Sequence, residues 1–90
     1  MTAAPSQAND NRSLVRGLEI LRAFKPGIDV LGNSELAERT GLPRSTISRL
    51  TGTLVRAGFL QHDTRVGGYR LHATVLALAQ AMRSGSYILN

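Results

Sequence analysis

The chain has 90 residues, of which 42% are apolar and 19% are charged, a balance typical of one small globular domain rather than a disordered segment. It carries no cysteine, which excludes a disulfide framework, a thiolate zinc site and a cysteine nucleophile. The polar start does not read as a secretory signal, and no segment has the roughly 18 apolar residues that cross a bilayer, so we expect no membrane partner and a cytoplasmic location.

The net charge of the chain is +5, and arginine supplies ten of its eleven basic side chains. The planar guanidinium group matches phosphate oxygens and guanine edges, so this charge favours a nucleic-acid partner. An inert basic surface or an acidic membrane would fit the charge equally well in sign. Because a domain this small buries only roughly 60 to 65% of its unfolded surface, we also expect a partner subunit or a further domain.

The N-terminal part is expected to contain an arm and one helix. Residues 1–12 are polar and show no periodicity, which predicts a flexible arm. A first helix is expected over about Leu14 to Lys25, with Ser13 as its N-cap and Pro26 ending the run. Its apolar stripe is broad, and serves either as a wide core face or as a second contact surface used in pairing.

Two further helices follow in close succession. Ile28 to Leu31 is expected to form one brief strand, and Ser34 to about Thr40 a second helix capped by Gly32 or Asn33. Gly41 is placed to end this helix in a left-handed conformation.

A third helix is expected over about Pro43 to Ala57, with Pro43 at its first position and Gly58 closing it. At 100° per residue its apolar and polar side chains separate onto opposite faces. The apolar face comprises Ile47, Leu50 and Leu54, with Thr51 beside them. The opposite face is polar and basic, and comprises Ser45, Ser48, Arg49, Gly52 and Arg56, flanked by Arg44 and Thr46.

The C-terminal part is expected to form a hairpin and a helix. Strands at Phe59 to Asp63 and Gly68 to Leu71 flank a glycine-containing turn and form a wing. The segment from Ala73 to Met82 reads as a helix that is apolar on nearly every side, so it must be covered on more than one side. The predicted fold is a winged helix-turn-helix, mainly α with a small β-hairpin. It occupies residues 13–72, and residues 73–90 form a connector helix and tail.

A short helix, a tight turn and a second helix with a polar outer side are typical of a motif that seats its second helix in the major groove. We therefore predict binding to double-stranded DNA. Base and near-base contacts are assigned to Arg44, Ser45, Thr46, Ser48 and Arg49. Contacts to the DNA backbone are assigned to Arg12, Ser13, Asn33, Ser34, Arg56 and Arg65.

Three of these assignments have alternatives. Arg49 is the best candidate for two parallel hydrogen bonds to a guanine, or else it pairs with Glu38 or Glu35. Gly52 lowers helix stability and invites a close approach to a DNA strand, or else it relieves crowding. Arg65, at the tip of the hairpin, could enter the minor groove.

Arg16 and Arg70 could add charge to the backbone contacts. Nothing in the sequence points to catalysis. His62 and His72 have no third ligand at a metal-like spacing, and Gly67-Gly68 lacks any nucleotide-binding fingerprint around it. We expect no enzyme activity, no metal and no cofactor.

Several segments between Arg12 and Met82 keep one register with a known family. They are Ser13 to Leu21, Glu35 to Ala37, Thr40 to Pro43, Ser45-Thr46, Arg49-Leu50, Thr53-Leu54, Gly58 to Leu60 and Tyr69 to Leu71. Together they resemble the N-terminal DNA-binding domain of IclR-type transcriptional regulators. The match is specific because it includes the first helix and the wing as well as the generic motif.

This resemblance implies dimers or higher homo-oligomers on palindromic operators, and a larger C-terminal domain that senses a small-molecule effector. We expect a transcriptional regulator, and a repressor rather than an activator. The chain ends at Asn90 without an effector domain, so we expect a truncated fragment. The family usually has Gly at the position of His72 and a second Leu at that of Thr51, and Thr51 and Gly52 could change operator preference.

The main alternative is a winged-helix module for protein association without DNA binding, in which the third or the fourth helix packs on a partner. DNA binding should weaken steeply with salt, whereas apolar docking should barely respond. RNA binding is less favoured because exposed aromatic side chains for base stacking are scarce.

Overall fold

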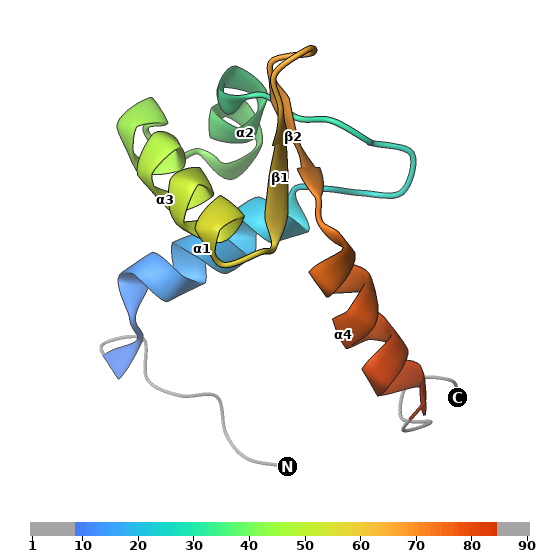
Figure 1. Ribbon diagram of the computed structural model, residues 1–90. Coiled ribbons are helices and arrows are strands. Elements are labelled where there is room, and N and C mark those ends of the chain that lie inside the picture. The colour runs from blue at the N-terminus through green and yellow to red at the C-terminus, as the bar shows by residue number, and fades with distance from the viewer. Residues whose placement is uncertain (1–8, 85–90) are drawn as a thin grey trace.

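The computed structural model describes residues 9–84, and within them it contains four α-helices and one antiparallel hairpin (Figure 1). The predicted fold class, mainly α with a small hairpin, is confirmed. In chain order the elements are α1 (Arg12–Arg22), α2 (Asn33–Thr40), α3 (Arg44–Arg56), β1 (Leu60–Asp63), β2 (Gly68–Leu71) and α4 (Ala73–Ser84).

Helix α1 begins and ends earlier than predicted. Its N-cap is Asn11 rather than Ser13, because Oδ1 of Asn11 accepts the backbone N–H of Leu14 at 2.9 Å. That amide would otherwise lack an intrahelical partner. The helix ends at Arg22 rather than Lys25, since the next backbone N–H groups already bond to carbonyls three residues back.

The brief strand predicted at Ile28 to Leu31 is reduced to one residue. Leu31 forms an isolated antiparallel bridge with Tyr69, with N···O distances of 3.1 and 2.8 Å. The pairing stops there because the next residue, Gly32, already serves as the N-cap of α2. A single bridge nevertheless ties the segment before α2 to the edge of the hairpin.

The turn between α2 and α3 follows the prediction closely. Gly41 has a φ of 76° and donates its N–H to the carbonyl of Ala37 at 2.8 Å, which is the expected left-handed helix end. Pro43 is the N-cap of α3 rather than its first helical residue, since its ψ of 149° is extended.

The hairpin also agrees with its prediction, apart from a start one residue later at Leu60. Leu60 pairs with Leu71 and Asp63 with Gly68, so the intervening turn spans residues 64–67. Gly67 has a φ of +67°, a backbone conformation that glycine adopts without steric cost.

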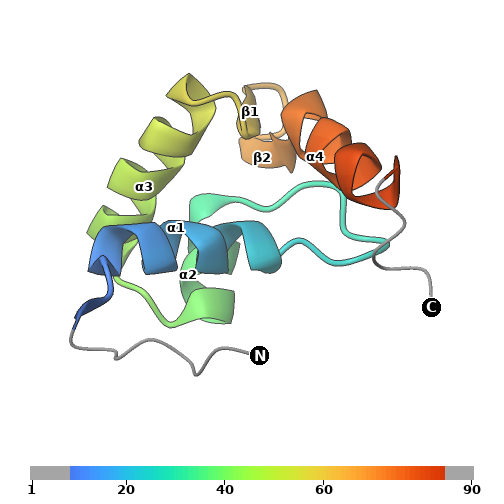
Figure 2. The ribbon, with the colours of Figure 1, turned by 90° about the horizontal axis from the view of Figure 1, so that it is seen from below.

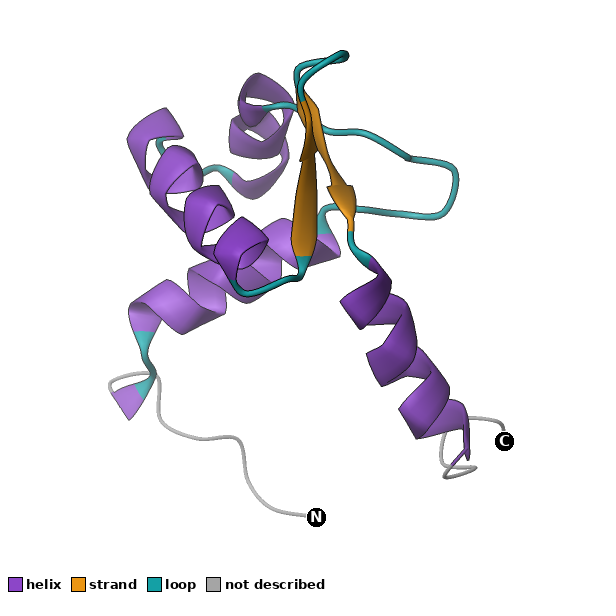
Figure 3. Ribbon diagram, in the orientation of Figure 1, coloured by secondary structure: helices purple, strands orange, loops and turns teal. Residues whose placement is uncertain are grey.

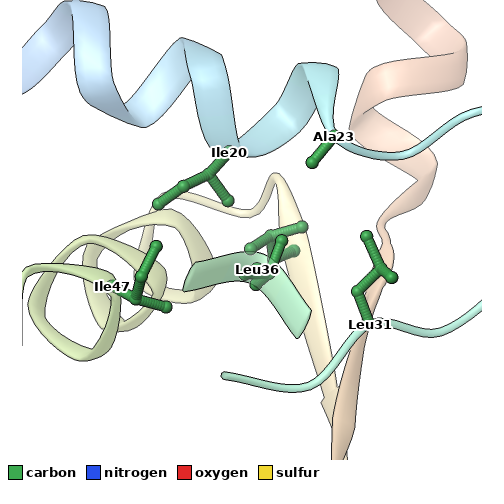
Figure 4. Close-up of a cluster of buried hydrophobic side chains, with 6 residues drawn as sticks. Ile20, Ala23, Leu31, Leu36 and Ile47 are labelled. Carbon is green, nitrogen blue, oxygen red and sulfur yellow. The ribbon is translucent and has the colours of Figure 1, made fainter. Parts of the chain in front are cut away.

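The core lies where three helices meet the hairpin. Ile20 of α1, Leu36 of α2 and Ile47 of α3 are fully buried and point toward one another, with Leu31 beside them (Figure 4). Leu60 of β1 belongs to the same cluster. Figure 2, seen from below, shows α1 lying across the near side of α2. Both helices contact α3, so the inner face of α3 is held from two sides.

Helix α4 leads away from this core (Figure 3). Leu76, Leu78 and Met82 are more than half exposed, at 58%, 57% and 52%. The predicted apolar helix is therefore present, and its described side chains are exposed from residue 76 to residue 82, whereas Thr74 and Val75 are half-buried. Residues 9–84 contain no helix with both the length and the apolar character needed to cross a membrane.

The two glycines of the helix-turn-helix differ in backbone conformation, which predicts opposite effects of alanine. Gly41→Ala places a side chain in the left-handed region and should lower the free energy of unfolding by about 1 to 2 kcal/mol. Gly52→Ala lies within α3, where a Cβ would meet only the end of Arg56 at 3.4 Å. It should raise the stability by about 0.5 to 1 kcal/mol.

Urea denaturation of both variants and the parent chain measures this difference. The added Cβ at Gly41 meets no atom within 4 Å, so a loss there reports the backbone alone. A shift of both variants in the same direction would contradict the assignment of the turn.

Candidate nucleic-acid interface

Helix α3 carries the predicted contact face on its solvent side. Its inner residues Ile47 and Thr51 are fully buried, and these anchor the helix in the core. The residues assigned to base and near-base contacts lie on the other side. Arg44, Ser45, Ser48 and Arg49 are exposed, Thr46 is half-buried, and Arg56 is exposed at the end of the helix.

Arg49 is free to meet a ligand. Among the side chains described, those of residues 9–82, the ion pairs involve only Arg65 and Arg70 as bases, so the alternative pairing of Arg49 with Glu38 or Glu35 is not formed. An exposed guanidinium group on a helix that the core holds in place can present its donors in a fixed direction.

Gly52 forms a shallow notch on the same face. The guanidinium group of Arg56 lies over it, and Nη2 of Arg56 donates to the hydroxyl of Thr53 at 3.5 Å. A Cβ at Gly52 would make only an ordinary contact with Arg56, so relief of crowding does not explain the glycine.

Thr51 lies inside the molecule rather than on the contact face. Its hydroxyl donates to the carbonyl of Ile47 at 2.7 Å and lies 3.3 Å from the hydroxyl of Tyr69 in β2. Because the side chain is fully buried, Thr51 could change operator preference only indirectly, through the position of α3. The residue instead joins α3 to the hairpin.

The start of α1 lies beside this face. An open hollow of about 500 Å³ separates the two helices, lined by Ser13 of α1 and by Ser48, Arg49 and Arg56 of α3. Arg12 and Ser13 are both exposed in the first turn of α1. The structure thus brings Ser13 and the α3 side chains around one hollow.

The other predicted backbone contacts gather at the hairpin turn. Asn33 and Ser34 are exposed in the first turn of α2. The N-cap before them, Gly32, is so close to the turn that an added Cβ would lie 3.3 Å from the carbonyl of Gly67. Arg65 projects from the same turn with 87% of its side chain exposed. In Figure 1 this turn and the N-terminal end of α3 lie toward the same end of the molecule.

Arg70 does not add free charge to this surface, as the sequence suggested. Its Nε and Nη2 donate to Oδ2 of Asp63 at 3.2 and 3.1 Å, and its Nη1 donates to Asp29. The side chain is 31% exposed and both of its partners are acidic. The guanidinium group is therefore committed inside the chain.

Asp63 is not among the predicted site residues, although it organises the hairpin turn. Its Oδ1 accepts the backbone N–H of Arg65 at 3.0 Å, the two-residue spacing by which aspartate side chains close turns. That spacing, directly before the turn, was the available signal. The hydrogen bonds from Arg70 hold the pKa of Asp63 below its ordinary value; burial acts in the opposite direction, and the amide of Arg65 lowers the pKa further.

The two histidines contact neighbouring residues of the hairpin and of the start of α4. The ring of His62 lies 4.9 Å from that of Tyr69 across the hairpin, and Nδ1 of His72 accepts the N–H of Thr74 at 3.4 Å. Among the described residues, no three His, Asp or Glu side chains gather as metal ligands would.

Comparison with known proteins identifies a family. A model described as the IclR helix-turn-helix domain matches residues 13–64. The HTH-type transcriptional regulator TsaQ1/TsaQ2 of Comamonas testosteroni is 49% identical over 71 residues, which are 79% of this chain and 25% of that protein. The transcriptional repressor IclR of Escherichia coli is 34% identical over 62 residues, which are 69% of this chain and 23% of that protein.

The solved structures agree. An IclR family regulator from Brucella abortus superposes with a TM-score of 0.77 at 49% identity, over 84% of this chain and 29% of that one. HmgR of Pseudomonas aeruginosa gives a TM-score of 0.72 at 31% identity, over 79% of this chain and 29% of that one. The chain thus spans about a quarter of the length of the curated relatives that it matches.

The pairing of Asp63 with Arg70 predicts a defined pH dependence. Asp63→Asn should lower the free energy of unfolding at neutral pH, because the charged hydrogen bonds from Arg70 are lost. The pKa of Asp63 is depressed in the folded state, so this stability is complete above the unfolded-state pKa of about 3.9. It is lost as the pH falls through the lower folded-state pKa.

Urea denaturation of the parent chain and of Asp63→Asn, from about pH 7 down to about pH 3, measures the effect. The two stabilities should converge toward the acid end of this range. The charged groups that face Asp63 are Arg65 and Arg70. A difference that stayed constant over the range would contradict the charged role of Asp63.

Proposed function

The chain belongs to the IclR family of helix-turn-helix transcriptional regulators, and from this premise we propose that it binds double-stranded DNA sequence-specifically through α3. The observation that carries the proposal is the free outer face of α3, where Arg49 has no acidic partner within residues 9–84 while the inner face is locked in the core.

The major groove is about 12 Å wide and admits one α-helix. In our proposal the N-terminal half of α3 enters it, and Arg49 donates two hydrogen bonds to the O6 and N7 atoms of a guanine. Ser45 and Ser48 are short donors on the same side, and Arg44 and Thr46 flank them. These five side chains are the proposed base and near-base contacts.

The proposed backbone contacts form two groups. Ser13 of α1 and Arg56 at the end of α3 line the hollow, and Arg12 directly precedes Ser13 in α1. Asn33, Ser34 and Arg65 gather at the hairpin turn. Helix starts offer unpaired N–H groups that suit phosphate oxygens, and exposed arginines add charge.

We further propose that residues 13–72 form the DNA-binding unit and that α4 is a connector helix. Arg12 belongs to α1 rather than to the predicted arm, and residues 1–8 of that arm and 85–90 of the predicted tail lie outside the described residues. The exposed apolar side chains of α4 suit a second subunit, and a homodimer on a palindromic operator follows from that pairing. Repression is favoured because one relative is named as a transcriptional repressor. Such a regulator acts in the cytoplasm, and a small-molecule effector would bind outside residues 13–72.

A second candidate function is protein association through α4. The observation in its favour is the exposure of Leu76, Leu78 and Met82. The two functions respond differently to salt, because phosphate contacts release counterions and apolar contacts do not.

Two arginine variants separate base reading from backbone binding. Arg49→Ala should weaken operator binding by about 1 to 3 kcal/mol and relax sequence preference, because a base contact is lost. Arg65→Ala should weaken binding to operator and scrambled duplex alike. It should also reduce the slope of log affinity against log salt concentration by about one, the contribution of one phosphate contact. Fluorescence anisotropy with DNA from upstream of the gene, at several salt concentrations, measures both.

Arg22→Ala is the matched control. It removes the same charge from the exposed end of α1 far along the helix from Ser13. The control should reproduce the affinity of the parent chain. Unchanged affinity and selectivity in Arg49→Ala would remove Arg49 from the interface, and binding that ignores salt would favour protein association.

A further inference from the structure

The turn of the hairpin is held by a single acidic side chain. Both carboxylate oxygens of Asp63 are occupied, Oδ1 by the backbone N–H of Arg65 and Oδ2 by two nitrogens of Arg70. The backbone carbonyl of Asp63 also accepts the N–H of Gly67 at 2.9 Å, which closes the turn from its other end. The position of the turn therefore depends on where Asp63 is held.

Arg70 connects this turn to the body of the domain. Its third nitrogen donates to Asp29, 41 residues earlier, in the long loop between α1 and α2 (Figure 3). The bridge between Leu31 and Tyr69 joins the same two segments. The two segments approach closely, since a Cβ on Gly68 would clash with a methyl group of Val30. The loop thus holds the hairpin at residues 68–70 of β2.

Arg65 lies in this turn with its backbone held and its side chain exposed to solvent. Its amide is bonded to Asp63 while its side chain is 87% exposed, with Nε 3.5 Å from the same carboxylate. The backbone of Arg65 is therefore held, and its guanidinium group remains available to solvent. A held backbone reduces the conformational freedom that a bound Arg65 would otherwise lose.

We propose that Asp63 and Arg70 are positioning residues for DNA binding, which hold the hairpin turn so that Arg65 meets the phosphate backbone. The inference rests on the proposed function of this face. The proposal predicts the opposite effect on DNA affinity from charge alone. A carboxylate repels the DNA polyanion within a Debye length of about 10 Å, so charge alone predicts tighter binding when Asp63 is neutralised. Positioning requires weaker binding.

The test is a double-mutant cycle on the affinity for upstream duplex at fixed salt. Asp63→Asn and Arg70→Gln should each weaken binding about 3- to 10-fold when Arg65 is present. In the background of Arg65→Ala, either change should alter binding less than about 2-fold, because the side chain they position is gone. The salt dependence of Asp63→Asn should approach that of Arg65→Ala.

Three outcomes would overturn the proposal. Tighter binding by Asp63→Asn would mean that its charge acts only by repulsion. Additive losses in Arg70→Gln and Arg65→Ala would mean that Arg70 touches the DNA itself. Unchanged binding by Arg65→Ala, with Arg49→Ala still impaired, would remove the hairpin from the interface while leaving the proposed function intact.

Arg70→Lys separates the charge of Arg70 from its geometry. It keeps the charge but lacks the planar group that binds Asp63 through two nitrogens, so it should weaken DNA binding as Arg70→Gln does if Arg70 is a positioning residue. Retained affinity in Arg70→Lys would overturn the proposal. The amide NMR signals of Arg65 and Gly67 should move in Asp63→Asn while those of the core residue Leu36 stay in place, a change that a loss of fold would not produce.

Arg39→Gln is the matched charge control. It removes one positive charge from the exposed end of α2, away from the hairpin turn, and should bind as the parent chain does. If the parent chain and all variants bind the duplex equally weakly, including Arg49→Ala, the proposed function fails and this inference fails with it.

Discussion

The burial of Ile47 between Ile20 and Leu36 is the contact on which the rest of the structure depends. These three side chains come from α3, α1 and α2 and are fully buried together. Close-packed interiors tolerate little change of shape, so α3 cannot turn about its axis without placing a polar neighbour such as Ser48 in the core. The orientation of the outer face is therefore a consequence of how the inner face packs.

Local patterns were sufficient for most of the elements. The spacing of apolar residues predicted α2, α3 and both strands to within a residue or two, because each of these buries one side. The start of α1 was misjudged because Asn11 and Ser13 are both good caps, and only the bond from Asn11 to the amide of Leu14 decides between them. The strand expected before α2 is reduced to the bridge between Leu31 and Tyr69, because the next residue, Gly32, already caps α2.

Long-range polar contacts could not be predicted from the sequence. Thr51 bonds to a residue 18 positions away, and Arg70 to one 41 positions away. Neither pairing leaves a trace in local spacing. The net charge of the chain counts Arg70 as a cation that could bind DNA, but two carboxylates already pair with it. The free positive charge of the face is therefore smaller than the composition suggests, and it is concentrated on α3 and at the hairpin turn.

Strand β2 joins the two halves of the candidate interface. Successive side chains of a strand point to opposite faces, so neighbouring residues can serve different partners. Tyr69 faces α3 and meets the hydroxyl of Thr51, whereas Arg70 faces the loop and holds Asp63. One short strand thus relates the helix proposed for the major groove to the turn proposed for the phosphate backbone. A duplex presents groove and phosphates at a regular spacing, and two contact points linked in this way suit such a ligand better than two points on independent loops.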